Sequence, residues 1–229
     1  MAFIIALFGP DGAGKTTLAK MIAVYLQAKG IKVSYVRFKS HHLAMYLLIR
    51  LMQKLRLLPS TTSPRILDYA IKHRFNRSKL FISLEIANAI IWLLLNIRLR
   101  SMLGTKIIIA ERYIPDFIVS MLLVKCDINT FNTLLRLFRK FTANGISIFL
   151  YAKPEDIIDR KKDENLSINY IKLLLKLYKH VAKYVNVNLA INTSQHSIPK
   201  TFSIAKNHID KHLKQTHYHR HKQRLLQAS

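Results

Sequence analysis

Cysteine, glycine and proline are scarce in this chain of 229 residues, and each shortage excludes a class of protein. The single cysteine, Cys126, excludes an internal disulfide framework and a zinc site built from cysteines. It is also typical of a protein from a reducing compartment, so we expect a cytoplasmic location. Six glycines and six prolines argue against a low-complexity or largely disordered chain. Half of the residues are apolar, which is enough to bury one sizeable core.

Long hydrophobic runs are missing as well. The longest apolar run, Leu80 to Leu95, is too short to span a bilayer comfortably and contains Glu85 and Asn88. The amino-terminal residues lack the basic segment and the cleavage site of a signal peptide. We therefore expect a soluble protein without a transmembrane segment.

Acidic side chains are the last shortage, since 37 Lys and Arg residues face only 12 Asp and Glu, for a formal net charge of +25. Such a balance attracts polyanions, so weak nonspecific binding to nucleic acid or to an anionic surface is expected. A phosphate-handling enzyme with few acids would have the same composition. The net charge therefore gives information about binding partners but none about the fold.

Apolar runs that predict strands alternate with patterns that predict helices. Strands are expected over Ala2–Phe8, Lys32–Phe38, Lys106–Ala110, Ile146–Tyr151 and Val185–Asn192. Helices are expected over Lys15–Ala28, His41–Leu58, Ile66–Phe75, Ser78–Leu103, Pro115–Lys125, Asn129–Thr142, a stretch that opens at Pro154, Tyr170–Tyr184 and Pro199–Lys214. This alternation predicts an α/β protein with a parallel sheet covered by helices on both faces.

The strongest motif is the run GPDGAGKT, which has the pattern of a Walker A loop and lies between an apolar strand and a helix. Its glycines permit a tight loop whose backbone N–H groups face phosphate oxygens, and the helix that follows adds a partial positive charge. Lys15 is expected to reach the β- and γ-phosphates of ATP, and the Thr16 hydroxyl to bind Mg²⁺. The expected ATP site is Gly9, Asp11, Gly12, Ala13, Gly14, Lys15, Thr16 and Thr17.

A second candidate lies at the end of the third predicted strand, where Glu111 and Arg112 follow an apolar run. A carboxylate at this position is a Walker B-like arrangement. Glu111 would hold Mg²⁺ or act as a base toward a hydroxyl. Arg112 would lie at the carboxyl end of the sheet, where open α/β folds bind their ligands, and its planar fork suits a phosphate.

A charge cluster after the fourth strand predicts a helical lid over about residues 153–168. Lid cations neutralise the charge that develops on a transferring phosphoryl group and exclude water. Arg160 is the first candidate for this role, with Lys161 and Lys162 as reserves. A solvated helical face would have the same composition.

Four further residues are candidates for the acceptor substrate. Arg37 and Phe38 end the second predicted strand, on the same edge as the glycine-rich loop. Glu85 and Asn88 lie three residues apart on one face of an apolar helix. Buried polar groups need partners, so this pair either recognises a substrate or bonds to neighbouring backbone.

Together these motifs resemble the thymidylate kinase family of nucleoside monophosphate kinases. The resemblance rests on Gly9 to Thr17, on Glu111-Arg112-Tyr113 in place of that family's Asp-Arg-Tyr, on Arg37, on Pro154 to Glu164 with Tyr170 and Tyr178, and on Ala190 to Ser194. It implies a three-layer α/β/α P-loop NTPase fold with strand order 2-3-1-4-5, over residues 1–214, and leaves residues 215–229 as a basic, His-rich tail. It also implies a homodimer.

The same resemblance implies transfer of the γ-phosphoryl group of ATP to a nucleoside monophosphate, dTMP first, with Arg112 and Arg37 on the acceptor phosphate. Asp11 would contact the acceptor sugar or position cations, and Lys15, Glu111, Arg112 and Arg160 would be catalytic. The chain departs from the family after Arg37 and lacks its base-contacting arginine between Leu80 and Gly104. Two alternatives therefore stay open: a P-loop kinase for a deoxynucleoside or another metabolite, and an ATP-binding protein that binds polyanions.

Overall fold

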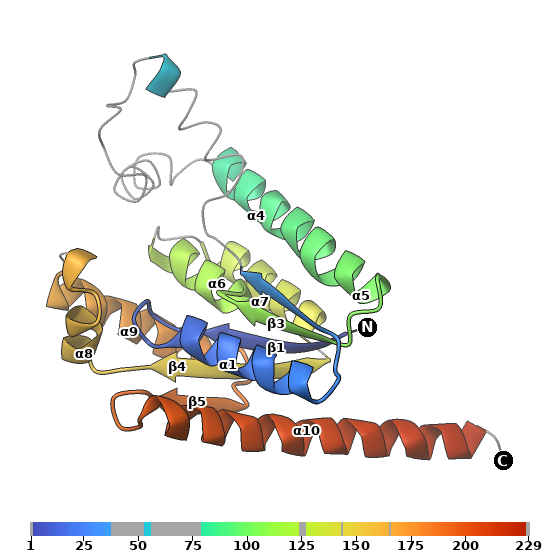
Figure 1. Ribbon diagram of the computed structural model, residues 1–229. Coiled ribbons are helices and arrows are strands. Elements are labelled where there is room, and N and C mark those ends of the chain that lie inside the picture. The colour runs from blue at the N-terminus through green and yellow to red at the C-terminus, as the bar shows by residue number, and fades with distance from the viewer. Residues whose placement is uncertain are drawn as a thin grey trace.

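A parallel sheet forms the centre of the computed structural model, which describes residues 2–37, 53–55, 79–123, 127–142, 144–164 and 166–227 (Figure 1). Its strands are β1 (Phe3–Phe8), β2 (Val33–Arg37), β3 (Ile107–Glu111), β4 (Gly145–Tyr151) and β5 (Leu189–Asn192). They pair in the order β2-β3-β1-β4-β5, and every pair is parallel. The predicted five-stranded sheet and its strand order are therefore confirmed.

Helices cover both faces of this sheet. One face carries α1 (Lys15–Ala28) and α10 (Ile198–Gln227). The other carries α4 (Lys79–Leu93), which continues through the π-helical segment η1 (Leu94–Leu99) into α5 (Arg100–Met102), together with α6 (Ile114–Leu123), α7 (Ile128–Thr142) and α9 (Ile168–Ala182). The short α8 (Pro154–Asp159) and the 3₁₀ segment η2 (Lys162–Glu164) follow β4 at the carboxyl end of the sheet.

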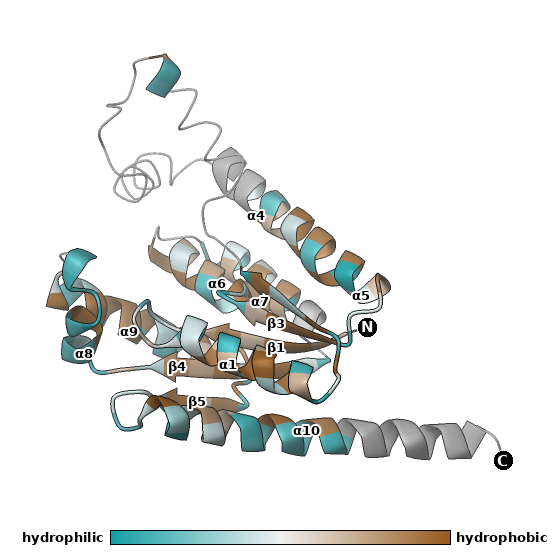
Figure 2. Cartoon of the chain, in the orientation of Figure 1, coloured by the Kyte–Doolittle hydropathy of each residue, from teal (hydrophilic) through white to brown (hydrophobic). Residues whose placement is uncertain are grey.

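The alternation of side chains along β1 explains why two helical layers form. Ile4, Ala6 and Phe8 pack into the cluster that contains α4, α6, α7 and α9. Phe3, Ile5 and Leu7 point the other way, into the cluster of α1 and α10. Every residue of β1 is buried, as expected for a central parallel strand. Figure 2 shows the hydrophobic colours gathered on these central strands.

Three details differ from the sequence prediction. Strand β5 begins at Leu189 and not at Val185, because residues 183–186 form a turn in which Asn186 has φ 43°. The helix expected to end at Lys214 continues to Gln227. The helix expected over Ser78–Leu103 is present from Lys79 and contains the π-helical segment. The division of the chain into residues 1–214 and a tail stays a prediction.

The helices expected over residues 41–58 and 66–75 lie outside the described residues, apart from residues 53–55. Within the described ranges, no helix is both long enough and apolar enough to cross a membrane.

Candidate functional site

The glycine-rich loop joins β1 to α1 and runs directly against β4. Gly9 has φ 140°, and a Cβ atom added there would lie 1.9 Å from the backbone oxygen of Leu150. Only glycine can occupy this position without a shift of the backbone. Gly14 has φ 84° and caps the start of α1, so the amino terminus of that helix opens toward the loop. The loop thus has the shape and the helix dipole of an anion cradle.

Lys15 is folded back onto this loop. Its Nζ donates to the carbonyl oxygens of Gly9 at 2.6 Å and Pro10 at 2.8 Å, and it lies 3.4 Å from Oδ1 of Asp11. The side chain is only 4% exposed. Burial lowers the pKa of Lys15, while the carboxylates of Asp116 and Asp11 oppose that shift. A buried cation therefore lies at the loop. It is bound by neutral carbonyl oxygens, which a charged phosphate can replace because it is a stronger acceptor.

Glu111 ends β3 directly beside Thr16. The Thr16 hydroxyl donates to Oε1 of Glu111 at 2.6 Å, the hydroxyl of Tyr35 donates to Oε2, and Nε of Arg37 lies 3.6 Å from Oε1. Glu111 is 1% exposed, so these contacts fix its carboxylate. A hydroxyl and a carboxylate at this distance form an all-oxygen donor set, which suits Mg²⁺ that also binds phosphate oxygens.

Arg112 leaves the sheet through an unusual backbone conformation. Its φ is 53°, a region that residues other than glycine rarely adopt, and such residues gather at functional sites. Its Nη2 lies 2.6 Å from Oδ1 and 2.7 Å from Oδ2 of Asp11. Burial raises the pKa of Asp11, but Lys15, Arg112 and Lys161 outweigh it, so the pKa is lowered overall. Asp11 therefore stays ionised and links the loop to β3.

A second carboxylate lies behind this pair. Oδ1 of Asp116, in the first turn of α6, accepts a hydrogen bond of 2.8 Å from the hydroxyl of Tyr178 on α9. Burial raises the pKa of Asp116 to about 6, against the opposing effects of Lys15, Tyr178 and Arg112. Sequence reasoning missed Asp116, although a lone acid in the apolar run of α6 is a usable signal.

Arg160 ties the predicted lid to two other loops. Its Nη1 donates to the carbonyl oxygen of Gly12 and to Oγ1 of Thr193, and its Nη2 donates to the carbonyl oxygen of Thr193, each at 3.0 Å. The two reserve cations have other partners: Lys161 pairs with Glu164 and Lys162 with Asp159, both at 2.7 Å. Arg160 thus hydrogen-bonds to the glycine-rich loop, while Lys161 packs beside Gly12 and lines the same cavity.

These side chains share one cavity of about 610 Å³, a size suited to a nucleotide-sized ligand. Of the predicted site residues, it is lined by Asp11, Gly12, Gly14, Lys15, Thr16, Thr17, Arg37, Glu111, Arg112 and Arg160. Gly9 and Ala13 lie in the same loop. Phe38 and the side chain of Glu85 lie outside the described part of the chain. Asn88 is described on α4 but does not line this cavity, so the structure does not bring it to the site.

Sequence reasoning missed one wall of the cavity. Besides Leu18 of α1 and Lys161 of the lid, the other lining residues are Met21 of α1 and five residues from the segment after β5: Thr193, His196, Ser197, Ile198 and Thr201. A polar segment that follows the last strand at the carboxyl edge of a parallel sheet is the signal that identifies them. Tyr35 was also missed. It lies two residues before Arg37 on β2, and side chains two residues apart on a strand point to the same face of the sheet.

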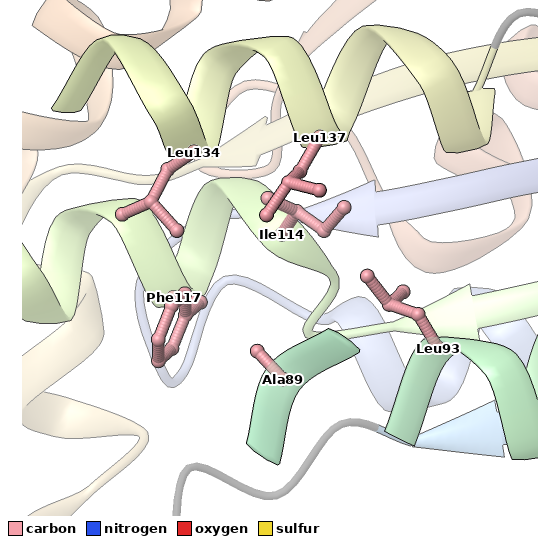
Figure 3. Close-up of a pocket in the computed structure, with 6 residues that line it drawn as sticks. All are labelled: Ala89, Leu93, Ile114, Phe117, Leu134 and Leu137. Atoms are coloured by element: carbon pink, nitrogen blue, oxygen red, sulfur yellow. The ribbon is translucent and has the colours of Figure 1, made fainter. Parts of the chain in front are cut away.

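A second, smaller recess lies between α4, α6 and α7 (Figure 3). Its lining is wholly apolar: Ala89, Leu93, Ile114, Phe117, Leu134 and Leu137. It offers no polar group to a substrate, so it belongs to the packing of the core.

Comparison with known proteins agrees with this geometry. The model of the family "ATPase family associated with various cellular activities (AAA)" matches residues 5–54, which include the second part of β1, the glycine-rich loop and α1. No curated protein sequence matches the chain. The crystal structure of the YorR protein from Bacillus subtilis, in complex with phosphorylated GDP, is similar with a TM-score of 0.53 and 18% identity, over 94% of this chain and 98% of YorR. The chain thus has a P-loop NTPase-like fold.

Proposed function

We propose that the chain is a kinase that transfers the γ-phosphoryl group of ATP to a nucleoside monophosphate, with dTMP as the first acceptor to test. The observation that carries this proposal is the pairing of two sub-sites in one cavity. The glycine-rich loop, Lys15, Thr16 and Glu111 suit a nucleoside triphosphate with its metal. Arg112 and Arg37 line the same cavity and suit a second anion.

On the ATP side, phosphate oxygens replace the carbonyl groups of Gly9 and Pro10 as partners of the Lys15 ammonium. Thr16 and Glu111 would hold Mg²⁺, and the ion would supply positive charge that offsets the charge of the transferring phosphoryl group. Arg160 contacts the carbonyl of Gly12 and lines the same cavity, so we assign its guanidinium to the γ-phosphate. These groups lower the barrier by positioning and by electrostatic stabilisation.

On the acceptor side, Arg112 exchanges its contact with Asp11 for the acceptor phosphate. A phosphate that is already ionised needs no base, so Glu111 is left to organise the metal. Two arginines on one acceptor fit a monophosphate better than a neutral nucleoside. The ligand in the YorR complex, phosphorylated GDP, extends the set of acceptors worth testing to guanine nucleotides.

A deoxynucleoside acceptor is the second candidate. It is favoured by the glutamate, Glu111, at the end of β3. Glu111 is a carboxylate held beside Thr16, where it can take a proton from an attacking hydroxyl. Both of its oxygens, however, already accept hydrogen bonds, from Thr16 and Tyr35. That arrangement suits a metal organiser better than a free base.

The test is ATP consumption by the purified chain with Mg²⁺, across nucleoside monophosphates, deoxynucleosides and oligonucleotides. Lys15→Ala should abolish turnover with every acceptor. Arg112→Gln should raise the KM for a monophosphate acceptor at least about tenfold, as the loss of one charged hydrogen bond does, while the KM for ATP changes little. Turnover with deoxynucleosides alone would select the second candidate, and no turnover with any acceptor would refute both.

A further inference from the structure

Asp116 is a carboxylate that the proposed reaction does not yet use. Its Oδ1 is bound by Tyr178, but its Oδ2 is shielded from solvent and has no hydrogen-bond partner among the described residues. A buried carboxylate oxygen without a donor is unfavourable, and each such atom in a folded protein calls for a reason. The geometry suggests that a donor reaches Oδ2 in another state of the site.

Arg112 supplies the complementary unpaired atom. Its Nη2 holds Asp11, but its Nε is also buried and has no hydrogen-bond partner in the described part of the chain. The charges of Arg112 and Asp116 attract each other, since Asp116 helps to raise the pKa of Arg112. Arg112 directly follows β3 and Asp116 lies in the first turn of α6, so the two residues are only four positions apart in the chain.

We propose that Asp116 is a positioning residue that holds Arg112 when Asp11 releases it to the acceptor anion, while Tyr178 fixes the orientation of the Asp116 carboxylate. This inference rests on the proposed function, in which Arg112 binds the acceptor phosphate. In the bound state, Oδ2 of Asp116 accepts from Nε of Arg112 and the Nη groups face the acceptor. Both unpaired atoms are then satisfied, and the guanidinium is fixed on the side away from the ligand.

The charged and titratable groups that face Asp116 are Lys15, Arg112, Asp11 and Tyr178. Lys15, Arg112 and the Tyr178 hydrogen bond all favour its ionised form, against burial and Asp11. Loss of either Arg112 or the Tyr178 hydroxyl should therefore move the titration of Asp116 to higher pH. The size of the shift in the absence of Arg112 measures how strongly the two side chains interact.

The first experiment needs no catalysis. Carbon-13 NMR of labelled aspartate carboxyls is followed against pH in the wild-type chain, Tyr178→Phe and Arg112→Gln, with Asp116→Asn used to assign the resonance. We expect an inflection near pH 6 in the wild type and an inflection at higher pH in both variants. An unchanged inflection in Arg112→Gln would overturn the proposal.

The second experiment measures coupling in the reaction. Asp116→Asn should lower kcat/KM for the acceptor about tenfold, a usual size for groups in one network, with the KM for ATP within about twofold. The double variant with Arg112→Gln should be no slower than Arg112→Gln alone. Asp210→Asn is the matched control, because Asp210, like Asp116, accepts a hydrogen bond from a tyrosine, but it lies on α10 and contacts Tyr25 and Lys29 away from the cavity. It should leave both KM values unchanged.

Additive losses in the double variant would overturn the proposal, because they would mean that Asp116 acts independently of Arg112. If no acceptor is turned over, the proposed function fails on its own. The NMR experiment then still decides whether Asp116 and Arg112 are coupled.

Discussion

Gly9 is the residue at which the fold and the candidate site depend on each other most directly. The loop must pass the backbone of Leu150 so closely that a single methyl group has no room, and φ is positive as well. Gly9→Ala should therefore destabilise the chain by about 3 kcal/mol or more, since both a strained backbone and a clash are imposed. Urea denaturation measures this loss, and ATP binding should disappear with it.

Gly30→Ala separates the two contributions. Gly30 also has positive φ, 72°, but nothing lies within 4 Å of an added Cβ. Its replacement should cost only about 1–2 kcal/mol, the usual penalty for a left-handed residue with a side chain. Equal losses for the two variants would show that the contact with β4 is not what requires glycine at position 9.

The ionisation of Asp116 gives a prediction about stability and pH. Its pKa is raised from 3.8 to about 6 in the folded chain, so folding favours the protonated form. The contribution of this group is therefore most favourable below about pH 4 and falls as the pH rises to about 6. Asp116→Asn should stabilise the chain at pH 7.5 by about 1–3 kcal/mol, since one pK unit is worth about 1.4 kcal/mol. The difference should close at pH 4, as thermal unfolding can show.

Asp210→Asn should behave in the opposite way. The hydrogen bond from Tyr25 and the contact with Lys29 outweigh burial and lower the pKa of Asp210. Its contribution is therefore present at neutral pH and is lost as the pH falls. This variant should lower the unfolding midpoint at pH 7.5, and a gain in stability there would contradict the assigned contacts.

Single residues could be predicted from sequence where a motif fixes the backbone around them. The Walker pattern places Lys15 and Thr16, and the end of an apolar strand places Glu111 and Arg112, so the structure brings all four into one cavity. Asp116 has no such pattern. Its importance comes from burial and from Tyr178, which lies 62 residues away, and only the tertiary fold shows that contact.

Among the elements, the strands were predictable because parallel strands buried on both faces are short continuous apolar runs. The start of β5 was misplaced because Val185 lies in a turn and is buried in the core cluster of α4, α6, α7 and α9, although it is not part of the sheet. In that region the side chain of Asn188 accepts from the backbone N–H of Ser147, so part of the contact with β4 is made by a side chain. Hydropathy alone does not distinguish these two kinds of burial.

The lid element gives a prediction of its own. Arg160 makes three hydrogen bonds that join the lid to the glycine-rich loop and to the loop after β5, yet it is exposed. Arg160→Ala should therefore change the free energy of unfolding by less than about 1 kcal/mol, as surface contacts do. We expect kcat to fall about 100-fold, because a preorganised cation is lost from the transition state.

Lys162→Ala is the comparison for this variant. Lys162 lies two residues further on, but it pairs with Asp159 at the surface and does not reach the loop. Its replacement should leave kcat unchanged. A larger loss of kcat in Lys162→Ala than in Arg160→Ala would contradict the assignment of the lid function to Arg160.

At the scale of the whole molecule, the net charge of +25 is the property that the fold does not explain. The cavity uses few of the 37 Lys and Arg residues, and most of the cations it does use are paired with Asp11 or Glu111. The remaining charge acts at the surface, where salt screens it over about 10 Å at 0.1 M. Binding of polyanions and of ATP should therefore differ in their response to salt.

Affinity for a single-stranded oligonucleotide should fall at least about 100-fold between 50 and 200 mM salt, because each neutralised phosphate releases counterions. Binding of ATP should fall much less, since Lys15 is buried and its interactions are weakly screened. Fluorescence anisotropy measures both. Lys15→Ala should lose ATP binding and keep the oligonucleotide binding, which would show that the two depend on different cations. Oligonucleotide affinity that barely changes with salt would remove the main support for a polyanion-binding role.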